Sequence, residues 1–187
     1  MYYAPAMITV VLAHPYPDRS RANRLLARAV DDLPSVAFRS LYDLYPDFAI
    51  DADAERAALA ASEVVVWQHP VLWYTAPALQ KLWFEQVLTP GWAYGPGGDA
   101  LRGKPCLWVA TTGGDGGDYA TDGVHGHLFD VFAGVVRQTA RFCGMQWLDP
   151  LVVHAANRLG DEALRAWGER YRTRLVALGA LGEVGHA

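Results

Sequence analysis

Apolar residues gather along this chain in short continuous runs, and the stretches between the runs carry apolar residues at helical spacing. The clearest runs are residues 7–12, 64–67 and 106–110. A strand that is apolar throughout is typical of a parallel sheet with both faces covered, since neither side of such a strand meets water. The pattern therefore predicts an α/β chain in which helices cross over between parallel strands.

The complete pattern predicts five strands and five helices. Ser20 is placed to cap the first helix, which ends before Pro34. Residues 145–153 form the last predicted strand, and the glycine-rich stretch that runs to Gly103 is a long ordered loop. The remaining strand is residues 36–41, and the remaining helices begin at Asp51 or Asp53, near Pro77, near Phe129 and ahead of Leu164.

Right-handed crossovers would join these strands into one doubly wound sheet. The simplest strand order is 2-1-3-4-5, the order of flavodoxin-like folds. We expect residues 1–187 to form a single flavodoxin-like domain, because neither a repeat nor a linker interrupts the alternation. Residues 1–6 are expected to be an extended start or a disordered tail.

Composition narrows the functional classes. The chain has 187 residues, is 52% hydrophobic and carries a formal net charge of −4. Without a basic surface it is not expected to bind nucleic acid. No apolar run reaches the ~20 residues that span a bilayer, and residues 1–6 do not resemble a signal peptide, so a cytoplasmic protein is expected. Cys106 and Cys143 have no CxxC spacing and are predicted to be buried, reduced thiols.

Three loops follow the three clearest apolar runs, and each precedes a helical segment. They are residues 14–20, 70–74 and 111–117. The carboxyl ends of parallel strands lie along one edge of a sheet, so we expect the loops to form three walls of one pocket. A helix start that can bind phosphate, aromatic groups and glycine-permitted amides together suit a flavin mononucleotide, FMN.

The first loop offers a phosphate site at the start of a helix. Unsatisfied amides and the helix dipole favour an anion there, and the Ser20 hydroxyl and His14 can add hydrogen bonds. Arg21 adds charge if it points inward, and Asn23 can reach a phosphate oxygen or a ribityl hydroxyl. The alternatives are that Ser20 only caps the helix and that Asn23 is a solvated helix residue.

The second loop can hold the edge and faces of a flavin ring. Pro70 forces an extended backbone on His69, which exposes the amides that follow. Trp73 is the candidate ring to flank the isoalloxazine and exclude water, with Tyr74 beside it. The alternative is that these rings pack in the core or in a dimer interface.

The third loop allows a ligand to approach the backbone closely, because Gly113 and Gly114 lack side chains. Beyond the glycines, Tyr119 and His125 can donate hydrogen bonds or a proton where negative charge develops on a reduced ring. The alternative is an ordinary polar surface loop. His125 and His127 also have a spacing that metal ligands use, but no carboxylate or cysteine set accompanies them, so no metal is predicted.

Several of these motifs occur together, in order, in one known family. They are residues 13–17 with Ser20 and Asn23, residues 67–70 with Trp73 and Tyr74, residues 91–95, and residues 111–114. Through them the chain resembles the NAD(P)H:quinone reductases of flavodoxin-like fold, from about residue 7 to about residue 155. It is most similar to a small bacterial branch that includes the ancillary oxidoreductase of glutathione-regulated potassium-efflux systems.

The resemblance implies a homodimeric flavoprotein that passes two electrons from NADH or NADPH to a quinone in a ping-pong cycle, with active sites at the subunit interface. It assigns Tyr119 and His125 to hydride transfer. The residues that it assigns to the cofactor are His14, Ser20, Arg21, Ala22 and Asn23 for the phosphate and ribityl chain, Pro70, Val71, Leu72, Trp73 and Tyr74 for the isoalloxazine, and Thr111, Thr112, Gly113 and Gly114 for its pyrimidine end.

The resemblance also leaves alternatives. FMN is favoured over FAD, because the chain is shorter than the animal quinone reductases and lacks their carboxyl-terminal extension, which leaves less protein around an adenine half. The choice between NADH and NADPH stays open. Another function is a regulatory subunit that binds a membrane potassium-efflux antiporter, which would place the chain at the inner face of the membrane. A one-electron flavodoxin carrier ranks third, because the chain is only mildly acidic and carries an aromatic flap at residues 91–98.

Overall fold

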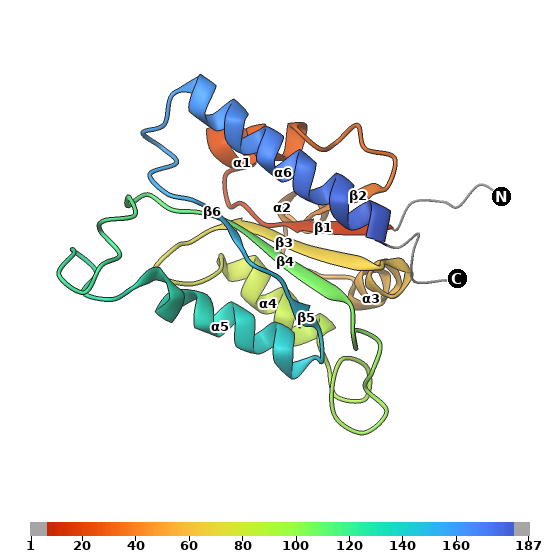
Figure 1. Ribbon diagram of the computed structural model, residues 1–187. Coiled ribbons are helices and arrows are strands. Elements are labelled where there is room, and N and C mark those ends of the chain that lie inside the picture. Colours follow the sequence, from red (N-terminus) through yellow and green to blue (C-terminus); the bar gives the residue numbers. More distant parts are fainter. Residues whose placement is uncertain (1–6, 182–187) are drawn as a thin grey trace.

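The computed structural model describes residues 7–181, and the tail expected at residues 1–6 lies outside them. Within the described residues, parallel strands form one sheet with helices on both faces (Figure 1). The strand order is β2-β1-β3-β4-β5, with β6 also paired to β4, which confirms the predicted flavodoxin-like order 2-1-3-4-5. The strands are β1 (Ile8–Leu12), β2 (Val36–Ser40), β3 (Val64–Pro70), β4 (Pro105–Thr111), β5 (Gln146–Trp147) and β6 (Leu151–Val153).

The helices bury a separate core on each face of the sheet. Helices α1 (Arg21–Arg28) and α6 (Asp161–Leu181) lie side by side on one face (Figure 1). The opposite core contains Trp67, Trp83 and Trp108. On that face lie α2 (Leu41–Leu44), α3 (Ala52–Ala61), α4 (Ala78–Val87) and α5 (Phe129–Phe142). None of the helices within residues 7–181 has both the length and the apolar character needed to cross a membrane.

The middle of the sheet explains the continuous apolar runs of the sequence. All seven residues of β3 are buried, and this strand lies between β1 and β4. Side chains on both of its faces therefore contact covering helices rather than water. Cys106, in β4, and Cys143, at the end of α5, are free and buried, as predicted.

The last predicted strand is wrong in one respect, because it is broken in two. The Leu148 N–H donates to the carbonyl of Cys106 at 3.0 Å, and the ladder then stops until β6 begins at Leu151. Pro150 has no N–H to donate, which accounts for the break. Both segments pair with β4, so the order of the sheet is unchanged.

The number of helices also differs from the prediction. The described residues contain six α-helices instead of five, because α2 follows β2 directly. With four residues, α2 is too short to produce a helical period in the sequence. Helix α1 ends at Arg28 and is followed by turns, so it stops several residues before Pro34.

Candidate functional site

The three predicted loops meet at the carboxyl-terminal edge of the sheet. The parallel register sets Leu12 opposite Gln68 and Pro70 opposite Thr111, so the strands end close together. Between the loops lies a cleft of about 380 Å³, which we call the loop cleft. It is lined by His14, Arg19 and Ser20 from the first loop, Arg21, Ala22 and Asn23 from the first turn of α1, Pro70, Val71 and Leu72 from the second loop, Thr111, Thr112 and Gly113 from the third, and Ala156 and Asn157.

Helix α1 begins at the wall of the loop cleft. The Ser20 hydroxyl accepts a hydrogen bond from the backbone N–H of Asn23 at 3.2 Å, so Ser20 caps the helix. Other amides of the first turn have no partner inside a helix. Because Arg21 and Ala22 also line the loop cleft, the capping role and an anion site are compatible here.

His14 is oriented by its own loop. Its Nδ1 accepts a hydrogen bond from the backbone N–H of Tyr16 at 3.1 Å. Burial lowers the pKa of His14, which favours the neutral ring. A neutral ring that accepts at Nδ1 carries its proton on Nε2, so His14 can donate a hydrogen bond to a ligand.

Arg21 does not point its charge freely into the loop cleft. Its guanidinium donates to the carbonyl of Leu159, and its Nε lies 3.2 Å from a carboxylate oxygen of Asp161. The side chain therefore ties the start of α1 to the start of α6, and the inward orientation considered from the sequence is not seen.

Asn23 joins the start of α1 to the third loop. Its side chain is buried, and its Nδ2 donates to the Thr111 hydroxyl at 2.9 Å, while its backbone carbonyl accepts from Gln68 Nε2 at 3.0 Å. The alternative of a solvated helix residue is therefore wrong. The Asn23 Oδ1 is buried without a hydrogen-bond partner among the described residues.

The second loop turns back on itself in a strained conformation. Leu72 and Thr75 exchange two backbone hydrogen bonds, at 2.9 and 3.1 Å, around Trp73 and Tyr74. Both central residues have positive φ, 49° for Trp73 and 67° for Tyr74. Two-residue turns of this type normally contain asparagine and glycine, because larger side chains clash with the backbone there. The Trp73 side chain is 93% exposed and lies outside the lining of the loop cleft, so its contact with a flavin stays a prediction.

Tyr119 and His125 lie together beside the third loop. Their rings stack with centroids 4.3 Å apart, and Tyr74 meets His125 edge-on at 5.5 Å. A Cβ on Gly114 would lie 3.1 Å from Nε2 of His125, so the imidazole approaches this glycine closely. Tyr74 also stacks on Phe132 of α5 at 5.0 Å. The predicted catalytic residues therefore form one aromatic cluster next to the glycines.

Comparison with known proteins agrees with this architecture. A model of the flavodoxin-like fold family matches residues 6–175. The chain belongs to the flavodoxin-like fold family. It is 48% identical, over 91% of its length and 95% of the relative, to the glutathione-regulated potassium-efflux system ancillary protein KefF of Klebsiella pneumoniae.

Solved structures superpose on most of the chain. General stress protein 14 of Treponema denticola, in complex with FMN, is 30% identical with a TM-score of 0.86, covering 92% of this chain and 99% of that one. An NADPH-quinone reductase of P. pentosaceus is 24% identical with a TM-score of 0.82, covering 90% and 96%. The similarity to this quinone reductase shows a shared flavodoxin-like fold.

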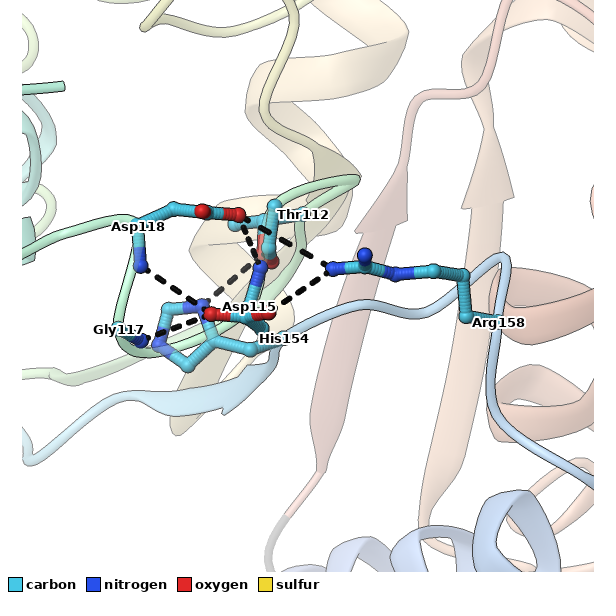
Figure 2. A network of polar contacts seen from close by, with 7 residues as sticks. Thr112, Asp115, Gly117, Asp118, His154 and Arg158 are labelled. Atoms are coloured by element: carbon cyan, nitrogen blue, oxygen red, sulfur yellow. Dashed lines mark hydrogen bonds and ion pairs between the residues drawn. The ribbon is translucent and has the colours of Figure 1, made fainter. Parts of the chain in front are cut away.

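A fourth loop, residues 154–160 after β6, contacts the third loop, residues 111–117, which we call the glycine loop. The Ala156 N–H donates to the carbonyl of Thr112 at 2.9 Å. Arg158 pairs with Asp115 at 3.2 Å (Figure 2). Sequence reasoning missed Ala156 and Asn157, which line the loop cleft. A signal was present, because this loop also follows a predicted strand and must emerge at the same edge of a flavodoxin-like sheet.

The strained turn gives a prediction about stability. We expect Trp73→Asn to raise the free energy of unfolding by about 1 kcal/mol, because asparagine tolerates positive φ better than tryptophan does. The exposed indole loses almost no burial when it is removed. Urea denaturation of the two proteins measures the difference.

The matched control is Val124→Asn. Val124 is 83% exposed, but its φ is not positive, so its replacement relieves no strain. Equal or lower stability of Trp73→Asn relative to the parent protein would show that the turn carries no strain at this position.

Proposed function

We propose that this flavodoxin-like protein is an FMN-dependent NAD(P)H:quinone oxidoreductase. The proposal depends on one observation: a capped helix start and a glycine loop share the loop cleft, and Tyr119 and His125 stack beside it. The similar protein of Treponema denticola, which is in complex with FMN, supports the choice of cofactor. Bound flavin would accept a hydride from NADH or NADPH and deliver both electrons to a quinone.

The residues around the loop cleft fit FMN. The first turn of α1 supplies amides for the phosphate, and His14 supplies a further donor from Nε2. The unpartnered Oδ1 of Asn23 is an acceptor that suits a ribityl hydroxyl. A Cβ on Gly113 would meet no atom within 4 Å, so this part of the loop is open to a ring.

Tyr119 and His125 are proposed to assist the transfer of hydride. Burial raises the pKa of Tyr119, so its phenol keeps a proton to donate at neutral pH. The stacked His125 lies next to Gly114, at the loop assigned to the pyrimidine end of the flavin. Donors at this position would stabilise the negative charge that develops there on reduction.

An anaerobic titration tests the function. The FMN-loaded protein should lose its flavin absorbance on addition of NADH or NADPH and regain it on addition of a quinone. In the double variant Tyr119→Phe, His125→Gln, we expect flavin reduction to slow by about 10²-fold, because general acid catalysis and hydrogen bonding are lost.

The matched control for this pair is His127→Gln. His127 belongs to the same loop, and its ring lies edge-on to that of Phe132 with centroids 6.4 Å apart. Reduction in this variant should proceed at the parent rate. Failure of the parent protein to bind FMN would contradict the function, and unchanged reduction in the double variant would exclude Tyr119 and His125.

A second copy of the chain is proposed to cover the groove between α4 and α5. This groove has a volume of about 750 Å³ and starts at Thr75, directly after the strained turn. Val131, Val135 and Phe142 of α5 are each more than half exposed beside it. A partner seated there would bury these apolar side chains and close the outer side of the aromatic cluster.

Val135→Asp should disrupt this dimer, because it places a charge in an apolar interface. Light scattering after gel filtration should give the mass of a dimer for the parent and of a monomer for the variant. The control is Val176→Asp on α6, where the valine is similarly exposed and lies outside the groove. A parent protein that is monomeric at micromolar concentration would contradict the proposal.

A regulatory role is the second candidate function. The identity of 48% to KefF, an ancillary protein of potassium-efflux systems, favours it. Such a role requires association with a membrane potassium-efflux antiporter and can coexist with catalysis. The tagged protein should copurify with an antiporter from detergent-solubilised membranes of its own organism. No enrichment over an unrelated tagged flavoprotein would contradict this role.

A further inference from the structure

His154 occupies a position beneath the glycine loop that no assigned role explains. It follows β6 directly, and its Nδ1 lies 2.9 Å from the Thr112 hydroxyl (Figure 2). The same hydroxyl donates to the carbonyl of Gly114 at 2.7 Å. A single atom, the Thr112 hydroxyl oxygen, therefore links His154 to the carbonyl of Gly114, in the loop assigned to the flavin ring.

The protons of this contact can be assigned by counting. A carbonyl only accepts, so the single proton of the Thr112 hydroxyl is used on Gly114. The hydroxyl oxygen must then accept from His154, which requires a proton on Nδ1. Burial lowers the pKa of His154, with a smaller opposing effect of Asp115, so the ring is neutral and Nε2 carries no proton.

His154 also contacts the aromatic cluster. Its ring centroid lies 5.3 Å from that of Tyr119 and 5.1 Å from that of Phe129, which meets it edge-on. The Thr112 side chain also lies next to the phenol of Tyr119, whose pKa is raised mainly by burial. One histidine therefore bears on both the glycine loop and the proposed proton donor.

We propose that His154 is a positioning residue that donates from Nδ1 to the Thr112 hydroxyl and so holds Gly114 and Tyr119 where a flavin ring requires them. That this hydrogen bond serves flavin binding rests on the proposed function. The hydrogen bond itself belongs to the protein without flavin, so the two ideas can fail separately.

The first test uses the protein without FMN. Long-range ¹H–¹⁵N correlation spectra identify which ring nitrogen of each histidine is protonated, and His154→Asn identifies the signal of His154 by its loss. We expect a neutral His154 with its proton on Nδ1 at pH 7. A proton on Nε2 alone, or a doubly protonated ring, would overturn the assignment whether or not FMN binds.

The second test compares two replacements of His154. Asparagine can place an amide N–H near the position of Nδ1, whereas leucine cannot donate. We expect His154→Leu to raise the dissociation constant of FMN, measured by flavin fluorescence, by about fivefold, and His154→Asn to recover most of that loss. His127→Asn, in a histidine outside the hydrogen-bond chain, is the matched control and should bind FMN like the parent.

Thr112→Val separates positioning from a general structural role. If His154 acts through the Thr112 hydroxyl, combining His154→Leu with Thr112→Val should weaken FMN binding no further than Thr112→Val alone. The pKa of the Tyr119 phenol, measured from ¹³C-tyrosine spectra of the flavin-free protein, should also change in the same variants.

Additive losses in the double variant, or an unchanged Tyr119 pKa, would overturn the proposal. Equal affinities of the leucine and asparagine variants would do the same. If the leucine variant does not fold, Thr112→Val decides alone, because an FMN affinity and a Tyr119 pKa equal to those of the parent would overturn the proposal. A parent protein that binds no FMN would contradict the proposed function and leave the tautomer and the Tyr119 pKa as the tests of the hydrogen bond.

Discussion

The parallel pairing of β3 with β4 is the constraint on which the site depends. Its register sets Pro70 opposite Thr111, and the Val71 N–H donates to the Thr111 carbonyl at 2.8 Å just beyond the ladder. The second and third loops therefore begin side by side, although about forty residues separate them in the sequence. Burial of every residue of β3 stabilises the pairing, because a shifted register would leave the buried backbone groups of both strands without partners.

Buried polar side chains connect this ladder to the first loop. Gln68 and Asn23, both fully or almost fully buried, link β3 to α1, and Asn23 continues to Thr111. His69 accepts from the indole N–H of Trp108 at 3.0 Å, and burial lowers its pKa to about 4, so it acts as a neutral acceptor. Polar groups are costly in a core unless they are paired. Their use here favours one relative arrangement of the loops.

The strained turn at Trp73 and Tyr74 is exposed and carries backbone strain, unlike the buried strands and polar side chains described above. Trp73 and Tyr74 hold left-handed backbone at an energetic cost, and Trp73 is almost wholly exposed. Tyr74 is held on one side by Phe132 and His125. Strain of this kind persists where the surroundings support it, and it is commonly found at binding sites. The exposed apolar residues of α5 extend the same face, which suits a site completed by a second subunit.

Much of this architecture follows from local patterns that can be read one segment at a time. The apolar runs, the Ser20 cap and the glycines of the third loop predict the sheet, its order and the cleft, because both faces of a central strand must be apolar and the carboxyl ends of parallel strands share an edge. Only the tertiary structure decided that Arg21 turns toward Asp161, that Trp73 points outward and that His154 lies beneath Gly114. Those outcomes depend on contacts between segments far apart in the chain, which no local pattern of residues encodes.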